Sequence, residues 1–542
     1  MRTTPIVPYV SAGQPGKDGF AQLLRAEWTK FKTVRGWVIT AIAVAVVTAV
    51  AVIDIAAIAR DNNTLPALAT GPDGESVTDA FYFVHQPLTG DGSIIVRVTS
   101  LVNVAGQPPG RTLGHGGHGG NSAQATARAA IQPSAKAGII VKEGTTPGSQ
   151  YAAVMATASD GVQMQYNFTH SVAGSPGIVS ATSPRWLRLS RSGDTLTGYD
   201  SANGSSWTEI GTVNLSGLPS TVQAGMFVAS PIAQVAEGTN NVTYIPTQAE
   251  ATFDDVGLHG QWSGPAWTGP AWTGTAWTGT DIGQAEQLAL DGGSPGVPHD
   301  GFARSGGTFT VAGSGDMAPY VPDVDPMQVS FYGSLFGLLM VIALGTQFIT
   351  VEYRRGMIRW TLIASPRRSR VLAAKAIVIG AVAFVVGLAG AAIAFPIAAQ
   401  RLQSEGWKAP YYQTLSLTSG AGVQVVAGTA ALLAAVAILA VAIGALLRRS
   451  AGTITTVIGL VVFPLVMSLI LPPGPASWLL RVTPAAAFGV QQALPRYPQA
   501  PAACLPYNGC FPLSPWGGFL VLCAWAAAAL GIAMLVLRSR DA

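Results

Sequence analysis

Apolar residues are gathered into six runs, each long enough to cross a lipid bilayer. The runs are residues 37–58, 331–351, 371–399, 420–447, 453–471 and 516–537. A membrane-spanning helix needs about 20 predominantly apolar residues. The runs are rich in Ala, Gly and Val and show almost no ionisable residues beyond Asp54. The pattern predicts an α-helical polytopic membrane protein with six transmembrane helices, and it gives no sign of the ion relay of a secondary transporter.

Between the first and the second run, the pattern changes to the alternation of β-strands. Val162, Met164, Tyr166 and Phe168 alternate with polar residues, a period of two that gives a strand one apolar and one polar side. Similar short runs lie at residues 80–85, 93–101, 125–131, 137–142, 151–158, 185–191, 195–201, 208–213, 222–229 and 249–259. About eleven strands separated by Gly, Pro, Asn and Asp predict an inserted all-β sandwich.

Charge distinguishes these two parts of the chain and predicts their sides of the membrane. Residues 60–330 contain 10 Lys or Arg and 21 Asp or Glu, which leaves 21 basic and 6 acidic residues for the membrane part. The basic residues flank the spans, and short basic flanks stay in the cytoplasm. We expect a multi-pass protein of a bacterial plasma membrane with both termini cytoplasmic and residues 60–329 extracellular. The expected units are 1–59, 60–329 with a β core at 78–260, and 330–542.

The loop between the second and third runs carries the strongest functional signal. It begins at Glu352, continues as a short amphipathic helix with Met357 and Trp360 opposite Arg355 and Arg359, and closes at Ser365-Pro366. Such a helix on the cytoplasmic side predicts a docking element for a cytoplasmic partner. The residues expected at that contact are Glu352, Tyr353, Arg354, Arg355, Gly356, Met357, Arg359, Trp360, Pro366 and Arg367.

The segment before the first run predicts a helix that lies in the inner membrane interface. Phe20, Leu24, Trp28 and Phe31 share one face of this helix, while basic residues occupy the other faces. We expect an elbow that leads into the first span.

Three segments of the membrane part carry a family resemblance. The first is Leu24-Arg25-Ala26-Glu27-Trp28-Thr29-Lys30-Phe31, before the first span. The second is Glu352-Tyr353-Arg354-Arg355-Gly356-Met357-Ile358-Arg359, with Ser365-Pro366-Arg367-Arg368 and Ala374-Lys375 after it. The third is Leu480-Arg481-Val482-Thr483-Pro484-Ala485. These segments resemble those of ABC-2 type permeases, in which the third belongs to the outer hairpin before the last helix. The resemblance covers roughly residues 20–58 and 330–542, with the inserted sandwich in place of a short outer loop.

The resemblance implies the permease subunit of an ABC transporter, and export as the direction. In such transporters two permease chains, identical or related, form the pathway, and a dimer of cytoplasmic ATPase chains contacts the loop after the second helix. The chain has no Gly-x-x-x-x-Gly-Lys-Ser/Thr phosphate loop. We therefore expect no cofactor in this chain and ATP bound by the partner subunit. The lipid bilayer surrounds the spans, and nucleic acid is not expected as a partner.

Several motifs of the inserted sandwich occur in the order of a known fold family. They are Phe81-Tyr82-Phe83-Val84-His85 with Gly90-Asp91-Gly92-Ser93-Ile94, then Ala137-Gly138-Ile139-Ile140-Val141-Lys142, and Trp186-Leu187-Arg188-Leu189 with Asn203-Gly204-Ser205-Ser206-Trp207. With these motifs the sandwich resembles the concanavalin A-like jelly roll. The resemblance implies extracellular glycan binding, with Trp186, Trp207 and Tyr199 as a platform for sugar rings, although aromatic residues on strands also serve as core. The paired carboxylates of a glycoside hydrolase are not evident, so we expect no enzyme. A membrane-anchored glycan-binding or sensing protein is the alternative function.

Two other segments leave alternatives open. Cys504 and Cys510 bracket a turn-forming spacer on the outer side, where they would close a small disulfide loop or remain thiols. Residues 265–279 repeat the pattern Ala-Trp-Thr-Gly three times. Their low-complexity composition predicts a linker first, and an aromatic belt or ligand platform second.

Overall fold

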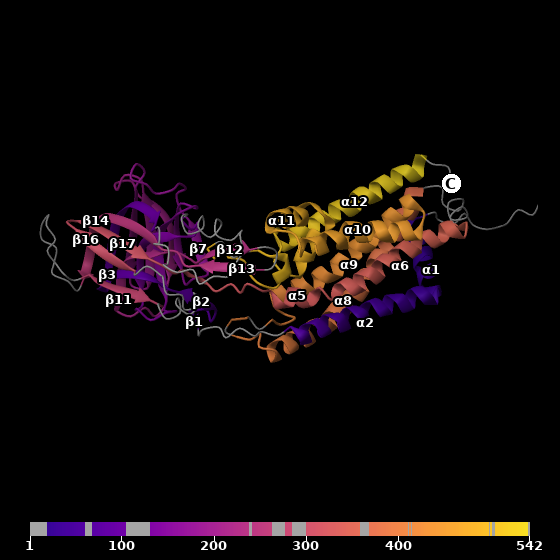
Figure 1. The fold of residues 1–542 in the computed structure, drawn as a ribbon, viewed down its shortest axis with the longest axis horizontal. Coiled ribbons are helices and arrows are strands. Elements are labelled where there is room, and N and C mark those ends of the chain that lie inside the picture. The colour runs from indigo at the N-terminus through magenta and orange to yellow at the C-terminus, as the bar shows by residue number, and fades with distance from the viewer. Residues whose placement is uncertain are drawn as a thin grey trace, which may run out of the picture.

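The computed structural model describes residues 19–59, 68–104, 131–237, 241–262, 277–283, 300–357, 368–409, 411–412, 415–497, 499–500 and 504–539. The molecule is elongated, with a β domain at one end and a helical bundle at the other (Figure 1). We call the end of the bundle that carries α5 (Pro326–Phe331) and α11 (Pro473–Val482) its proximal end, because it faces the β domain. The opposite end, where α1 (Phe20–Thr33) lies, is the distal end.

Six spans long and apolar enough to cross a membrane occur in the described part of the chain, which confirms the polytopic fold. They are α2 (Arg35–Ile58), α5 continued by α6 (Ser334–Arg354), α8 (Arg368–Ser404), α9 (Gly420–Leu447), α10 (Ser450–Ser468) and α12 (Pro515–Ser539). The central helix is α9, which packs against α6, α8, α10 and α12. Small residues allow this approach: a Cβ on Gly387 of α8 would lie 3.2 Å from Ala430 Cα of α9.

Between α10 and α12 the chain forms a hairpin at the proximal end. It consists of α11, the 3-10 helix η1 (Pro484–Gln491) and the short turn η2 (Pro506–Asn508). Cys504 and Cys510 form a disulfide in this hairpin, with a Cα–Cα distance of 5.0 Å.

The β domain is built from antiparallel strands that join into one large sheet and two small ones. The strands are β1 (Ala69–Thr70), β2 (Ser76–Asp79), β3 (Phe81–Asn103), β4 (Lys136–Lys142), β5 (Tyr151–Thr157), β6 (Val162–Tyr166), β7 (His170–Ala173), β8 (Arg185–Ser192), β9 (Thr195–Ser201), β10 (Thr208–Asn214), β11 (Thr221–Ala229), β12 (Ala233–Glu237), β13 (Asn241–Ile245), β14 (Ala249–Trp262), β15 (Thr278–Ile282), β16 (Gly301–Ser305), β17 (Thr308–Gly313) and β18 (Met317–Pro319). The main path of the large sheet runs β10-β9-β8-β3-β11-β4-β5-β6-β7, with β14, β15, β16 and β17 branching from it.

The long strand β3 organises the domain because both of its faces are covered. Phe81 and Phe83 belong to one apolar cluster, whereas Tyr82 and Val84 belong to another. All seven residues of β4 and of β5 are buried as well. A strand covered on both sides reads as a continuous apolar run, so the alternation found at residues 162–168 does not extend to these strands.

The sheet continues past the expected core at residues 78–260. Strand β17 pairs with β14, and β15 pairs with β3. Trp277 is buried and packs edge-on against Phe309 at 5.6 Å, so the linker predicted for residues 265–279 is wrong at this Trp. A low-complexity repeat does not show which of its aromatic rings finds a place in a core. Trp267, Trp272 and most of the expected strand at 125–131 lie outside the described residues.

A small clasp closes the β domain where the chain enters and leaves it. Strand β2 pairs with β1 on one side and with β18 on the other, so Val77 faces both Ala69 and Pro319. The first and last strands of the insertion therefore share one sheet.

The β domain also contacts the proximal end of the bundle. Gln499 Nε2, in the hairpin, donates to Phe168 O at 3.0 Å and to Thr169 O at 3.2 Å. Tyr244 on β13 donates its hydroxyl hydrogen to Asp323, which lies just before α5. The domain is thus seated on the hairpin and on the approach to the second span.

Candidate functional site

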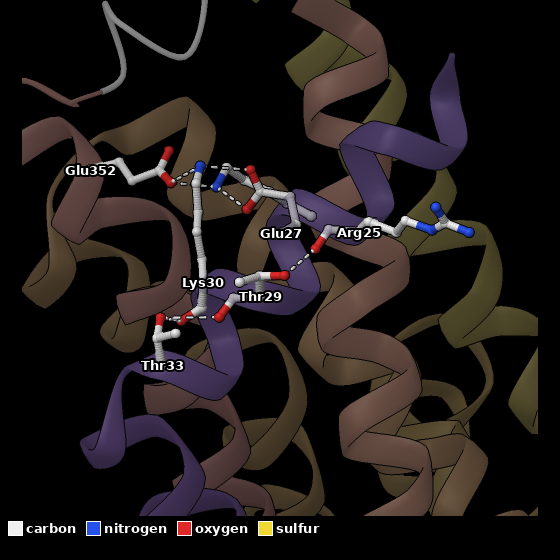
Figure 2. Close-up of polar contacts among 7 residues, drawn as sticks. Arg25, Glu27, Thr29, Lys30, Thr33 and Glu352 are labelled. Carbon is white, nitrogen blue, oxygen red and sulfur yellow. Dashed lines mark hydrogen bonds and ion pairs between the residues drawn. The ribbon is translucent and has the colours of Figure 1, made fainter. Parts of the chain in front are cut away.

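A buried cluster of four charged side chains joins three segments at the distal end of the bundle. Lys375 Nζ of α8 lies 2.6 Å from Glu27 Oε2 of α1 and 2.6 Å from Glu352 Oε1 at the end of α6. Lys30 Nζ of α1 lies 2.8 Å from Glu27 Oε1 and 3.1 Å from Glu352 Oε1. Figure 2 shows Glu27, Lys30 and Glu352 converging, while Arg25 points away from them. Each ammonium thus contacts both carboxylates, and we call these four residues the distal charge cluster.

Burial makes this cluster a strong constraint. The side chains of Lys375, Glu27 and Glu352 are only 1%, 2% and 5% exposed. Charges withdrawn from water are tolerated when they are paired, and removing one member of a buried pair typically costs about 3–5 kcal/mol. Two carboxylates and two ammonium groups give the cluster no net charge. It therefore stabilises the joint of α1, α6 and α8 only while its three buried members, Glu27, Glu352 and Lys375, are in place.

Aromatic packing explains why α1 turns Glu27 inward. Phe31 is buried one helical turn after Glu27 and packs against Phe348 of α6 at 6.3 Å. Phe348 in turn lies under Lys375, with Nζ 5.0 Å from the ring centroid. Residues four apart share a helix face, so Glu27 and Phe31 enter the bundle together.

Lys30 is the member of the cluster closest to solvent, with a side chain 39% exposed. Partial burial disfavours its charge, but the carboxylates of Glu27 and Glu352 outweigh this effect and raise the pKa of Lys30 above its ordinary value. Lys30 therefore remains an ammonium at physiological pH.

The stems of the loop between α6 and α8 are also tied to the neighbouring helices. The Arg448 guanidinium, at the end of α9, lies 5.2 Å from the centre of the Tyr353 ring. Arg368 Nη1, at the start of α8, donates to Leu537 O of α12 at 3.1 Å. Both stems are therefore anchored within the bundle.

The expected docking residues divide according to their exposure. Glu352 belongs to the distal charge cluster and Tyr353 is half-buried, whereas Arg354, Arg355, Gly356 and Met357 are exposed. Arg359, Trp360, Pro366 and Arg367 lie outside the described residues. Within residues 352–357, the loop thus changes from the buried carboxylate of Glu352 to exposed basic and apolar side chains.

The expected apolar face of the elbow helix is only partly buried against the bundle. Phe31 is buried and Leu24 packs against the same core, as an apolar face requires. Trp28, expected on that face, is 45% exposed, and Phe20 is half-buried. The ion pair between Glu27 and Lys375 fixes a rotation that the apolar positions alone do not define.

Sequence reasoning missed the partnership of Glu27, Lys30 and Lys375. Lys375 lies inside the predicted third run, although Asp54 alone was noted as ionisable within the runs. A lysine between Val371 and Ile379, in a membrane-length run, was the available signal for a buried charge pair.

The expected glycan platform is partly occupied by other groups. Trp186 on β8 has the Arg97 guanidinium 5.5 Å from its ring centre, and a Cβ at Gly204 would come within 2.8 Å of the ring. Tyr199 on β9 has the Arg188 guanidinium at 5.2 Å. Trp207 is half-buried. The structure brings Trp186 and Tyr199 onto neighbouring strands, but guanidinium groups already lie over their rings.

No group of three or more His, Cys, Asp or Glu side chains is arranged to hold a metal ion among the described residues.

Three solved structures show local similarity to the chain. One is a functionally unknown protein from Saccharomyces cerevisiae, with 13% identity over 37% of this chain and 86% of that one, at a TM-score of 0.22. Two are scytalido-glutamic peptidase, with a peptide-based transition state analog (7% identity) and with a transition state analog inhibitor (10%). Each of these covers 43% of this chain and 98% of its own, at a TM-score of 0.23. Similarity at this level assigns no activity or ligand.

The family comparison bears on the membrane part. No curated protein matches the chain. The model of the ABC-2 family transporter protein matches residues 232–542, which is more than half of the chain and includes every span after α2. The chain is a multi-pass membrane protein that belongs to the ABC-2 transporter family.

Proposed function

We propose that the chain is the permease subunit of an ABC exporter driven by a separate cytoplasmic ATPase dimer. A second permease chain, identical or related, completes the pathway, and this chain itself binds no cofactor and catalyses no reaction. Membership of the ABC-2 family supports the transporter class. The single observation that carries the coupling role is the distal charge cluster, because it ties α1 to both stems of the loop expected to contact the ATPase.

The cluster gives that loop a rigid base. A force applied by the ATPase to the loop reaches Glu352 on one stem and Lys375 on the other, and both contact Glu27. Since shear between α6 and α8 would separate buried charges, the three segments are expected to move together. Tyr353 and Arg368 extend this connection to α9 and α12. A displacement at the loop is thereby passed to most of the bundle.

Charge supports the orientation that this mechanism requires. Arg25, Lys30, Lys32 and Arg35 lie at the distal end together with Arg354 and Arg355. Flanks this basic remain in the cytoplasm, so the β domain would be extracellular and both termini cytoplasmic.

The orientation is testable by labelling. A Cys placed at Ser205 in the β domain should react with an impermeant thiol reagent on intact cells, whereas a Cys at Arg355 should react only after the cells are opened. Both positions are exposed in the structure. The unmodified chain, which retains Cys523, measures the background. Labelling of position 355 in sealed cells would reverse the proposed topology.

The proposed ATPase contact is tested by putting charge into the loop. Met357→Asp combined with Trp360→Asp should leave the protein in the membrane but abolish retention of the ATPase on purification, because desolvating two carboxylates at an interface costs several kcal/mol. Val34→Asp is the matched control, since Val34 is 41% exposed at the same end of the bundle but outside the loop. Undiminished ATPase retention in the double variant would remove the docking role.

For the β domain we propose a concanavalin A-like, lectin-like sandwich. The alternative function, a membrane-anchored glycan-binding or sensing protein, rests on Trp186, Tyr199 and Trp207. It has less support, because guanidinium groups lie over two of these rings.

A further inference from the structure

A cavity of about 390 Å³ lies at the proximal end of the bundle. Four segments enclose it: the approach to α5, helix α11, the chain after η1, and the disulfide loop. Polar side chains that line it include Asp323, Arg481, Gln492, Arg496, Tyr497 and Asn508. A concave site with a few convergent polar groups is a common location for a ligand.

The acidic groups at this cavity are already held by protein donors. Asp325 accepts hydrogen bonds from the backbone N–H groups of Gln328, Ala493 and Leu494, at 2.7–3.0 Å. Asp323 accepts one from the Tyr244 hydroxyl. Burial raises the pKa of both carboxyl groups above the ordinary value.

The two arginines at the cavity, Arg481 and Arg496, have no partner of opposite charge among the described residues. Arg496 Nη2 donates to Gln492 Oε1 at 2.9 Å and to Phe511 O, and it lies 4.0 Å from Cys510 Sγ. All of these partners are neutral, and burial lowers the pKa of the Arg496 guanidinium. In the part of the chain that the structure describes, neither Arg496 nor Arg481 forms an ion pair. Two guanidinium groups without carboxylate partners at one cavity leave room for an anion.

Exposed aromatic rings place the cavity near the depth of lipid headgroups. Trp478 of α11 is 63% exposed, and Trp516 at the start of α12 is 49% exposed. Rings of this kind are enriched where a membrane meets water. A ligand that enters the cavity from the side would therefore come from the headgroup layer.

We propose that this cavity binds a phosphate group, borne by a lipid headgroup or free in solution, with Arg481 and Arg496 as its charged donors. The volume exceeds what one small ion fills, which accommodates the organic part of a headgroup. The site is independent of the ATPase contact, because it lies at the opposite end of the bundle.

Calorimetric titration of the purified full chain in phosphate-free detergent tests this site. The probes are dihexanoyl phosphatidic acid, inorganic phosphate and uncharged dihexanoyl glycerol. We expect phosphatidic acid to bind, and Arg481→Gln with Arg496→Gln to weaken it by about 10-fold or more, because two charge-assisted contacts are lost. Binding of inorganic phosphate as well would show that the phosphate group alone suffices; its failure would assign the site to lipid.

Two further variants keep the result interpretable. Arg401→Gln removes an exposed arginine near the end of α8, at the same end of the bundle but not at the cavity, and should bind as the unmodified chain does. Arg481→Lys with Arg496→Lys retains the charge and should bind with intermediate affinity, even if the Gln variant fails to fold. Equal binding of dihexanoyl glycerol, no binding of either phosphate probe, or undiminished binding by the Gln variant would each overturn the proposal.

Discussion

Lys375→Met is expected to uncouple the ATPase from the bundle. It should also sharply lower the melting temperature of the chain itself. The substitution leaves Glu27 and Glu352 buried side by side, with Lys30 as the remaining cation in the cluster. Removing one partner of a buried ion pair costs about 3–5 kcal/mol. Lys30→Met should cost less than about 1 kcal/mol, because the Lys30 side chain is 39% exposed. Scanning fluorimetry of the purified chain compares the two variants, and Arg25→Met, on the same helix but outside the cluster, is the control.

A variant that removes the buried charges together can distinguish two roles of the cluster, positioning the docking loop and stabilising the fold. Replacing Lys375 by Met together with Glu27→Gln and Glu352→Gln removes the three buried charges together, which can leave stability almost unchanged. The remaining charge, on Lys30, reaches solvent because this side chain is 39% exposed. If the cluster positions the docking loop, this triple variant should melt near the unmodified protein yet fail to stimulate ATP hydrolysis by the bound ATPase. Recovery of both stability and stimulation would reduce the cluster to a structural role.

Residues 68–320 should fold as an isolated domain, whereas residues 78–260 should not. The shorter fragment lacks β1, part of β2 and β15 to β18, and so loses at least four large buried side chains: Ile282, Phe309, Val311 and Met317. At about 1.5–3 kcal/mol for each buried side chain, the loss is about 6–12 kcal/mol, as large as the whole stability of a typical domain. Circular dichroism should show a cooperative, β-rich melt for the longer fragment alone. A matching melt for 78–260 would mean that β17 contributes little to the sheet.

The sequence predicted the elements whose signal is local. Each membrane-length apolar run became a span, and the short runs at residues 137–142 and 195–201 became β4 and β9. The continuity of β3, which joins the expected strands 80–85 and 93–101 into one, was not predicted, because the residues between them read as a break in the strand. The pairing of β14 with β17 could not be predicted from the sequence either, since residues 263–307, which are rich in Gly and Pro, separate the two strands.

The distal charge cluster shows why the candidate site was harder to predict than the fold. Glu27 and Lys375 are 348 residues apart, and an entire β domain lies between them. Glu27 alone reads as an ordinary polar residue of an interfacial helix, and Lys375 signals a buried charge without showing its partner. Only the packing of α1 beside α8 makes them partners, and periodicity carries no information about which helices become neighbours.

The small sheet of β1, β2 and β18 is relevant to how a β domain can be inserted into a membrane protein during evolution. Because Val77 pairs with the strands at both ends of the insertion, the β domain enters and leaves the bundle at a single point. Insertions with adjacent ends are tolerated because they leave the host fold undisturbed. The β domain therefore has the form of an exchangeable cassette, and we expect members of the ABC-2 family to gain, lose or replace it while the six spans keep their arrangement.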